Sequence, residues 1–207
     1  MARTRILEAH QRILRGALDM FARRGIEGTS MDAIARAASV SKATIYSHWA
    51  DKEDLLMAVM VFVNGLERER EDVDTGDLCR DLATVLSHRP PNDFDEERRR
   101  ITPALIAYSA VHPEFGRAWR QRVTEPPRAS LRRVLERGIR RELLPANLDF
   151  ETSLALLLGP MLYVHIFSKD DPHNRPDLGP KVAEAFCRAF AIRPATPATP
   201  AQKARRR

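Results

Sequence analysis

Residues 28–56 read GTSMDAIARAASVSKATIYSHWADKEDLL, and this stretch decides the fold. Thr29 and Ser30 supply a hydroxyl N-cap for a short helix, and the Asp32 carboxylate completes a capping box in its first turn. A brief Ser-Val-Ser turn leads to Lys42–Trp49, which is too short to be a stable helix unless it packs against a neighbour. The stretch therefore predicts two short helices joined by a tight turn.

The second of these helices has an inner and an outer face. Ile45 and Trp49 lie four residues apart, so both point inward and anchor the helix. Ser41 opens the helix, and the remaining positions form a polar face with one aromatic ring: Lys42, Ala43, Thr44, Tyr46 and His48. A helix that is fixed along one edge and polar along the other has what a DNA-recognition helix needs.

Over roughly residues 8–60 the chain resembles the N-terminal helix-turn-helix of TetR-family transcriptional regulators. The spacing carries the resemblance, through Ile34-Ala35, Val40-Ser41-Lys42, Ile45-Tyr46, Trp49 and Lys52-Glu53-Asp54-Leu55. The family usually has Gly at the position of Ser39, a turn position that Gly occupies at lower cost, and Phe at the position of Trp49. The resemblance implies a DNA-binding module followed by a helical sensor domain.

The resemblance also implies which residues meet DNA. Thr29 or Ser30, with the exposed amides at the start of the first short helix, would hold a phosphate. Lys42 is the best candidate to bind guanine through O6 and N7, and Lys52 would take another phosphate. The expected DNA-binding set is Thr29, Ser30, Ser41, Lys42, Ala43, Thr44, Tyr46, His48 and Lys52. Alternatives stay open for three of them: an N-cap only for Ser41, packing for Tyr46, and a plain surface histidine for His48.

Helical signals continue along nearly the whole chain. Apolar residues recur at helical spacing, and no alternating run rich in Val, Ile or Thr is bounded like a strand. One helix is expected to begin at Pro103 with Thr102 as its N-cap, and another to break or kink at Pro126-Pro127. We therefore predict an all-α fold of about nine helices.

We divide the chain into four parts. A helix-turn-helix DNA-binding domain is expected over residues 1–50, a connecting fourth helix over 51–71, and an effector-binding and dimerisation domain over 72–192. Residues 193–207 repeat Ala-Thr-Pro and end in a basic run, a composition that cannot form a core, so a disordered tail is expected there. The tail either adds phosphate attraction or is simply solvated.

The last two expected helices, about 150–168 and 180–192, are the candidate dimer interface. The resemblance implies that they pack against their symmetry mates as a four-helix bundle. Between Leu154 and Ile166 the first of them is apolar almost all round, so it must be covered on several sides. A central core helix in a monomer is the alternative.

The resemblance also implies a small-molecule pocket in the sensor domain. Residues expected on its inner helices offer aromatic walls with a few polar points: Tyr108, His112, Phe115, Trp119, Met161 and His165. Aromatic residues at helical spacing also serve as ordinary core. The run Arg98-Arg99-Arg100 either meets an anionic ligand or forms a solvated face. The sequence does not identify the effector.

The charge of the chain is unevenly distributed. The net charge is +6, with 34 basic and 28 acidic residues. Residues 1–50 carry eight basic against four acidic side chains, and residues 193–207 carry five basic and no acidic ones. This pattern is expected when one end meets a polyanion. A GC-rich genome that favours Arg over Lys is the alternative.

Several classes of protein are not expected. The sequence contains no Gly-rich phosphate loop, no nucleophile elbow and no His-Glu-x-x-His pair, so we predict neither an enzyme nor a cofactor. Cys79 and Cys187 are far apart and have no metal-ligand spacing, so neither a disulfide framework nor a zinc site is expected. A metal-responsive site built from His112, His165 and Cys187 stays as an alternative, as does a DNA binder that needs no ligand.

Two further features bear on location. The charged start, Met1–Arg5, has no apolar run behind it, so no secretory signal is expected. The longest apolar tract, Leu154–Phe167, is too short for a membrane span. We therefore expect a cytoplasmic protein without a membrane partner.

These expectations combine into one functional hypothesis. The chain would form a homodimer whose paired recognition helices enter successive major grooves of a pseudo-palindromic operator. It would repress transcription until a small molecule in the sensor domain moves the fourth helix and changes the spacing of the two DNA-binding domains. The choice between repressor and activator, the operator sequence and the effector stay open.

Overall fold

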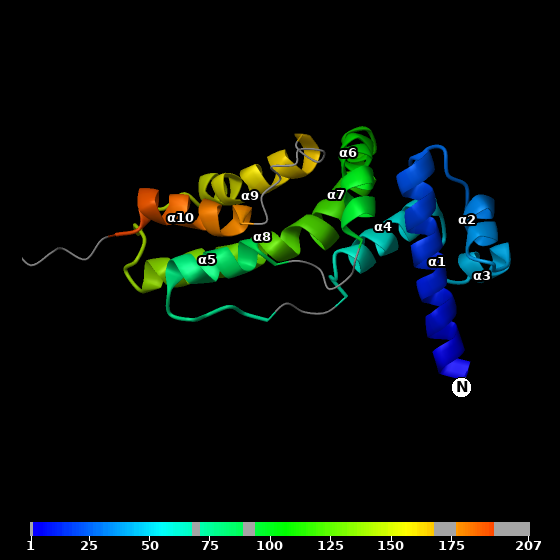
Figure 1. The fold of residues 1–207 in the computed structure, drawn as a ribbon, viewed down its shortest axis with the longest axis horizontal. Helices are drawn as coiled ribbons and strands as arrows, with labels where there is room; N and C mark the ends of the chain where they lie inside the picture. Colours follow the sequence, from blue (N-terminus) through cyan, green and yellow to red (C-terminus); the bar gives the residue numbers. More distant parts are fainter. Residues whose placement is uncertain (1, 68–70, 89–93, 168–176, 193–207) are drawn as a thin grey trace, which may run out of the picture.

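The computed structural model describes residues 2–67, 71–88, 94–167 and 177–192. Within these ranges the chain forms ten α-helices and one π-helical segment, η1, and no β-strand, which confirms the predicted all-α fold. The elements are α1 (Ala2–Arg24), α2 (Met31–Ala37), α3 (Lys42–Tyr46), α4 (Lys52–Val63), α5 (Leu78–Leu86), α6 (Asp95–Val111), α7 (Pro113–Trp119), η1 (Arg120–Thr124), α8 (Glu125–Arg140), α9 (Phe150–Phe167) and α10 (Leu178–Phe190) (Figure 1). No helix in the described ranges is long and apolar enough to cross a membrane. The expected tail, residues 193–207, lies outside the described residues.

Capping residues set the ends of the first helices. α1 ends before Gly25, whose φ of 75° lies in the left-handed region that glycine tolerates. Ser30 caps α2, because its side chain accepts a hydrogen bond from the Ala33 amide. Ser39, in the turn between α2 and α3, has a φ of 52°. This residue therefore adopts the conformation for which Gly is favoured, at a cost on the order of 1 kcal/mol.

Two proline-containing segments differ from the prediction. α6 begins at Asp95, eight residues before Pro103, and continues through that proline. The Thr102 hydroxyl donates to the Arg98 carbonyl of the preceding turn, so Thr102 is not an N-cap. The chain also runs unbroken from α7 through η1 into α8 past Pro126 and Pro127, since the wider π-helical turn lies just before the two rings. If α7, η1 and α8 are counted as one helix, the described residues form nine.

Buried side chains form two hydrophobic cores. The first, the head core, joins α1 to α4 with α6, α7 and η1, and includes Phe21, Ile34, Ile45 and Leu105. The second, the bundle core, joins α5, α8, α9 and α10. The two cores occupy opposite halves of an elongated molecule (Figure 1). The helices next to the predicted DNA-binding domain, α6 and α7, thus share its core rather than that of the bundle.

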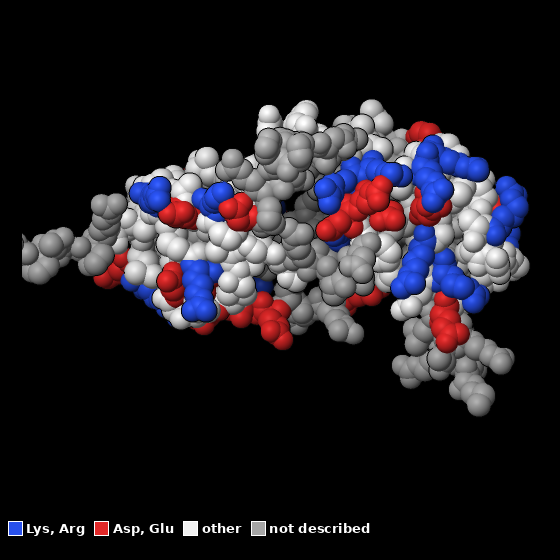
Figure 2. All heavy atoms as spheres, viewed as in Figure 1, with Lys and Arg blue, Asp and Glu red and all other residues white. Residues whose placement is uncertain are grey.

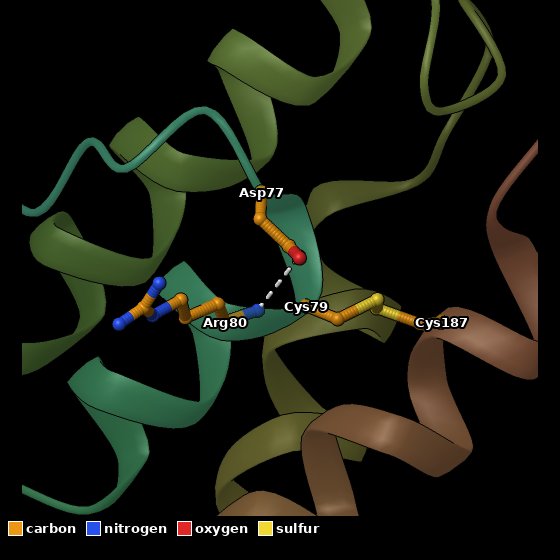
Figure 3. Close-up of a disulfide and its surroundings, with 4 residues drawn as sticks. All are labelled: Asp77, Cys79, Arg80 and Cys187. Atoms are coloured by element: carbon orange, nitrogen blue, oxygen red, sulfur yellow. Dashed lines mark hydrogen bonds between the residues drawn. A yellow bond between two sulfur atoms is a disulfide. The ribbon is translucent and has the colours of Figure 1, made fainter.

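A disulfide between Cys79 and Cys187 links α5 to α10, and the prediction that these cysteines are unpaired is wrong. Their Cα atoms are 6.0 Å apart although 108 residues separate them in the sequence (Figure 3). Sequence spacing carries no signal for such a pair, since only the folding of the bundle brings α5 beside α10. In this disulfide the Cys187 sulfur is not a free thiolate, and among the described residues no group of His, Cys, Asp and Glu side chains is arranged to hold a metal ion.

Candidate nucleic-acid interface

α3 is fixed to the head by its inner face. Ile45 is fully buried and Trp49, just beyond the helix, is 6% exposed, so both predicted anchors lie in the head core. At the start of α3 the Ser41 side chain accepts a hydrogen bond of 3.0 Å from the Thr44 amide. Ser41 is therefore the N-cap of α3, and its hydroxyl is still exposed to solvent.

The outer face of α3 is open to solvent. Lys42, Ala43 and His48 are exposed, Thr44 is half-buried, and Tyr46 is 45% exposed. Tyr46 is therefore not a core residue, which removes the packing alternative for this side chain. The structure thus presents one cation, one phenol, one imidazole and small polar groups along a single short helix.

Lys42 is held in place by two neighbours on this face. Its Nζ lies 2.8 Å from an Asp32 carboxylate oxygen on α2 and 5.9 Å from the centroid of the Tyr46 ring. The hydrogen bond to Lys42 lowers the pKa of Asp32, and the same hydrogen bond raises the pKa of Lys42. Both groups are therefore charged near neutral pH, and Asp32 orients the cation.

Three aromatic rings join α1 to the end of α3, a cluster that the sequence analysis did not identify. The His10 ring centroid lies 5.7 Å from that of His48 and 4.9 Å from that of Trp49. Burial lowers the pKa of His10, and the nearby His48 lowers it further. A histidine at helical spacing on an amphipathic α1 carries no signal for this contact, because its partners are almost forty residues away.

Thr29 and Lys52 were predicted to contact phosphates, but both side chains already have hydrogen-bond partners within the protein. Thr29 is 2% exposed, and its hydroxyl donates to the Gly25 carbonyl at 2.7 Å, with the Met20 carbonyl at 3.2 Å. Thr29 is therefore turned into the protein, and only Ser30 of this pair is exposed. Lys52 donates to the Ile26 carbonyl at 2.9 Å, which leaves two of its three N–H donors for another partner.

Basic side chains gather around these helices. Figure 2 shows Lys and Arg over α1 and along the edge formed by α2 and α3. The exposed basic residues of this part are Arg12, Arg15, Arg23, Arg24, Arg36 and Lys42. Exposed cations beside a helix with a polar outer face are the electrostatic pattern of a surface that binds a polyanion.

Tyr108 and His112, two of the predicted ligand residues, lie instead where α6 meets the start of α4. The Tyr108 hydroxyl donates to a Glu53 carboxylate oxygen at 2.6 Å, and burial, followed by Glu53, raises the pKa of Tyr108. The His112 ring stacks on Tyr108 with centroids 3.9 Å apart, and its nitrogens lie 3.8 Å from Glu53 and 3.7 Å from Glu27. This cluster ties α6 to α4 and to the loop before α2.

The other predicted ligand residues lie in both cores. Phe115 is buried edge-on against Tyr108, and Trp119 packs on the head core, whereas Met161 packs on the bundle core. The buried indole N–H of Trp119 has no hydrogen-bond partner among the described residues. The side chain of His165 lies outside the described residues.

The arginine run on α6 is not a free anion site. Arg98 is buried, donates to the Val63 carbonyl at 2.6 Å and pairs with Asp95. Arg100 pairs with Glu96. These arginines therefore fasten α6 to the end of α4 and to their own helix.

One face of α9 is apolar and exposed. The exposed side chains are Leu156, Leu162, Tyr163 and Phe167, and Phe167 is 72% exposed. On the neighbouring α10, Ala185 and Ala189 are exposed as well. Contiguous exposed apolar side chains of this kind are typical of an interaction surface.

Comparisons with known proteins identify relatives of both halves. The sequence model of the bacterial regulatory proteins of the tetR family matches residues 13–59, and that of a tetracyclin repressor-like C-terminal domain matches residues 72–178. The chain is 28% identical over 165 residues to the uncharacterized HTH-type transcriptional regulator YdeS of Bacillus subtilis, which covers 80% of this chain and 82% of YdeS. It is 35% identical over 103 residues to the regulator AcrR of Shigella flexneri, with 48% of each chain covered.

Solved structures have the same fold. A transcriptional regulator from Rhodococcus superposes with a TM-score of 0.66 at 21% identity, covering 89% of this chain and 99% of that one. FadR from Bacillus subtilis in complex with stearoyl-CoA superposes with a TM-score of 0.65 at 19% identity, covering 86% of this chain and 97% of FadR. These structures show that the chain shares the fold of these two transcriptional regulators.

Proposed function

Because the chain belongs to the TetR family of helix-turn-helix transcriptional regulators, we propose that it is a sequence-specific repressor that a small-molecule effector releases from its operator. One observation carries the proposal: α3 holds Lys42 and Tyr46 on an open outer face while Ile45 and Trp49 fix it from inside. Regulators of this family bind operators as dimers and respond to ligands.

Each residue around α3 has a role in this proposal. Lys42 reads guanine in the major groove, and Tyr46 and His48 meet base edges or phosphates beside it. The exposed hydroxyls of Ser30 and Ser41 lie at the N-termini of α2 and α3, where amides and hydroxyls together favour a phosphate. Ala43 leaves room for close approach, Thr44 contacts the backbone, and Lys52 uses its two remaining donors on a phosphate. Thr29 is left out because it is buried.

The proposed dimer is formed by α9 and α10. Leu162, Tyr163 and Phe167 on α9 are exposed in the single chain and would be covered by the same face of a second copy. The two recognition helices then meet successive major grooves of a pseudo-palindromic site. The apolar exposure of α9 argues against a monomer in which this helix is only a core element.

The effector site is proposed where residues 72–192 face α4. Trp119 offers a buried indole donor that has no hydrogen-bond partner among the described residues, and Phe115 and Tyr108 provide aromatic surface in the same head core. Met161 packs on the bundle core and is therefore left out of this site. The stearoyl-CoA bound by FadR supports a small organic ligand as the class of effector. A ligand that displaces Tyr108 breaks its hydrogen bond to Glu53 and so moves the start of α4.

The test is an electrophoretic shift assay with the DNA upstream of the gene, titrated with random competitor and with salt. The proposal is supported if the complex with the upstream DNA survives a competitor concentration that releases the protein from labelled random DNA. Equal affinity for all sequences would contradict the proposal. Lys52→Ala is expected to weaken binding to the upstream and the random DNA alike, and to reduce the slope of log affinity against log salt concentration by about one unit. Lys181→Ala, on α10, should bind as the wild type does.

A further inference from the structure

The Cys79–Cys187 disulfide has no role in the function proposed above. It lies in the bundle, at the end of the molecule opposite to α3 (Figure 1). A protein that binds genomic DNA works where cellular thiols keep cysteines reduced, and the disulfides that do form there are most often transient or redox-sensing. The position and surroundings of the bond therefore need an explanation other than permanent cross-linking.

We propose that Cys79 and Cys187 form a reversible thiol–disulfide site, and that reduction of their bond loosens α10 from α5 and weakens operator binding. The inference rests on the proposed function, because its final effect is on DNA affinity. The site itself is defined by three features of the bundle: access to the sulfurs, the position of Cys79 on its helix, and what the bond holds together.

Small thiols can reach the bond. An open surface pocket of about 410 Å³ lies beside it, and both cysteines line this pocket together with Pro180, Glu184, Arg188 and Ala191. In Figure 3 the Arg80 side chain points away from the sulfurs, so it does not cover them. Arg188, paired with Glu184 on the same helix, places a guanidinium at the pocket, and glutathione-like thiols carry carboxylates that such a group attracts.

The pocket stays open in the proposed dimer. Ala185 and Ala189, the exposed small residues of α10, lie two positions before and after Cys187. Two residues correspond to about 200° around an α-helix, so these alanines and Cys187 are on opposite sides of α10. A partner that covers the alanine side therefore leaves the pocket side of α10 uncovered, where Cys187 is 8% exposed and Cys79 is half-buried.

Cys79 is the sulfur better placed to leave as a thiolate. It is the second residue of α5, after Asp77, which caps the helix by accepting from the Arg80 amide at 3.0 Å (Figure 3). Free amides and the helix dipole stabilise a thiolate in the first turn of a helix. Cys187 lies near the end of α10, where this stabilisation is absent.

The disulfide holds one end of a close helix pair. At the other end Gly179 meets Ser87, where a Cβ on residue 179 would lie 2.7 Å from the Ser87 Oγ. The bond fixes the two helices at Cys79 and Cys187, and Ile192, just after α10, donates to the Leu143 carbonyl at 2.9 Å. Without the bond, only non-covalent contacts hold the C-terminal half of α10, a helix of the proposed dimer interface.

Reduction of the Cys79–Cys187 bond by a small thiol takes two thiol–disulfide exchange steps. The thiolate of a small thiol attacks the Cys187 sulfur, the S–S bond breaks, and Cys79 leaves as a thiolate that takes up a proton. A second small thiol, as thiolate, attacks the mixed disulfide, which frees Cys187 as a thiolate that is then protonated. Two electrons thus pass from two small thiols to the protein, which gives two cysteine thiols and one small-molecule disulfide. The same disulfide reverses the sequence as oxidant.

The test measures DNA binding of the full chain after equilibration in mixtures of reduced and oxidised glutathione. Alkylation of free thiols followed by mass spectrometry reports the state of the two cysteines in the same samples. We expect the pair to be reducible by glutathione without denaturant, and affinity for the upstream DNA to fall by at least about five-fold on reduction. The Cys79→Ser/Cys187→Ser double variant should bind like the reduced protein and show no response to the mixtures.

Two results would overturn the proposal while leaving the function intact: oxidised and reduced protein binding the upstream DNA equally, or a disulfide that glutathione does not open in the folded chain. If neither form distinguishes the upstream DNA from random DNA, the proposed function fails and the switch fails with it. Circular dichroism of the double variant shows whether a loss of DNA binding comes from a loss of fold. Circular dichroism of the reduced wild type answers the same question for a chain that carries no substitution.

Discussion

The head and the bundle of this molecule are held together in different ways. In the head, α2 and α3 are set by contacts between residues three or four apart, such as the Ser30 and Ser41 caps, and by anchors such as Ile45 and Trp49. In the bundle, the main ties join distant residues: Cys79 to Cys187, Asp72 to Arg137 of α8, and Asp74 to Arg141 just after α8. The two short helices of the head, α2 and α3, thus depend on local geometry, whereas these ties of the bundle depend on the folding of the whole chain.

This difference fits the two tasks that we propose for the protein. A recognition surface has to keep the same shape in every regulatory state, because it must match one DNA site, and local caps with a buried anchor achieve this. A sensor has to exist in two arrangements, and contacts between separate helices can change without unfolding any of them. The contact of Tyr108 with Glu53 ties α6 to the start of α4 within the head. The head continues into the bundle through α7, η1 and α8, which follow one another without a break.

The largest expected effect tests the anchor of the head. Trp49→Ala should lower the free energy of unfolding by about 3–5 kcal/mol, because it removes a large buried ring from the head core. DNA binding should be lost while the dimer, held by the bundle, persists in sedimentation. Tyr46→Ala, at the exposed ring three residues earlier, is the control and should unfold at nearly the wild-type urea concentration. A Trp49→Ala protein that still binds operator would show that α3 is not fixed by this residue.

The second prediction tests the long-range tie of the bundle. The Cys79→Ser/Cys187→Ser variant should unfold with a free energy lower by about 2–4 kcal/mol than the oxidised wild type, since the bond closes a long loop in the unfolded chain. The measurement is urea unfolding followed by circular dichroism. Wild type in reducing buffer should match the variant, and equal stability of all three proteins would mean that the non-covalent packing of α10 on α5 suffices.

The same contrast explains what could be predicted from the sequence. The spacing within residues 28–56 predicted the two short helices and the buried Ile45 and Trp49. The family resemblance marked Ser39 as a turn position that Gly occupies at lower cost, and the φ of Ser39 is indeed positive. Each of these features is fixed by neighbours within a few residues. Local patterns in the sequence therefore carried most of the information about the head.

The features that were missed depend on residues far apart in the sequence. The disulfide joins residues 108 positions apart, Arg98 reaches a carbonyl 35 positions away, and Tyr108 reaches a carboxylate 55 positions away. Thr29 was misjudged for a related reason, since its hydroxyl turns toward carbonyls at the end of α1 instead of outward. No periodicity or capping pattern specifies which distant element will lie beside a given side chain.

The third prediction concerns the recognition helix itself. Lys42→Ala should weaken binding to the upstream DNA by about 5- to 150-fold and relax the base preference at one position of the site. The measurement is a competition titration against single-base variants of the site. The matched control is Arg36→Ala, which removes an exposed cation on α2 and should weaken binding to all sequences alike. An equal loss on specific and random DNA for Lys42→Ala would show that this lysine only neutralises phosphate.

A smaller effect is expected from the partner of Lys42. Asp32→Asn removes the ion pair that orients the lysine and also removes a negative charge near the DNA. Affinity for random DNA should therefore rise slightly, while the ratio of specific to random affinity falls. The fall in this ratio should be no more than about five-fold, because exposed ion pairs are weak. Fluorescence anisotropy with both DNAs gives the ratio, and Asp19→Asn, whose carboxylate pairs with Arg23 on α1, is the control. An unchanged ratio would mean that Lys42 finds its base without Asp32.

The smallest effect is a dependence of head stability on pH. Because burial and His48 lower the pKa of His10 below 6.5, the folded head keeps this imidazole neutral while the unfolded chain begins to take up a proton. Stability should therefore fall as the pH drops below about 6.5 and level off below the folded pKa of His10. His10→Gln should flatten this part of the profile, and His48→Gln, which removes the second cause of the shift, should flatten it in part. Urea midpoints of the three proteins measured across this pH range test whether His10→Gln flattens the profile more than His48→Gln does. A steeper profile for His10→Gln than for the wild type would contradict the prediction.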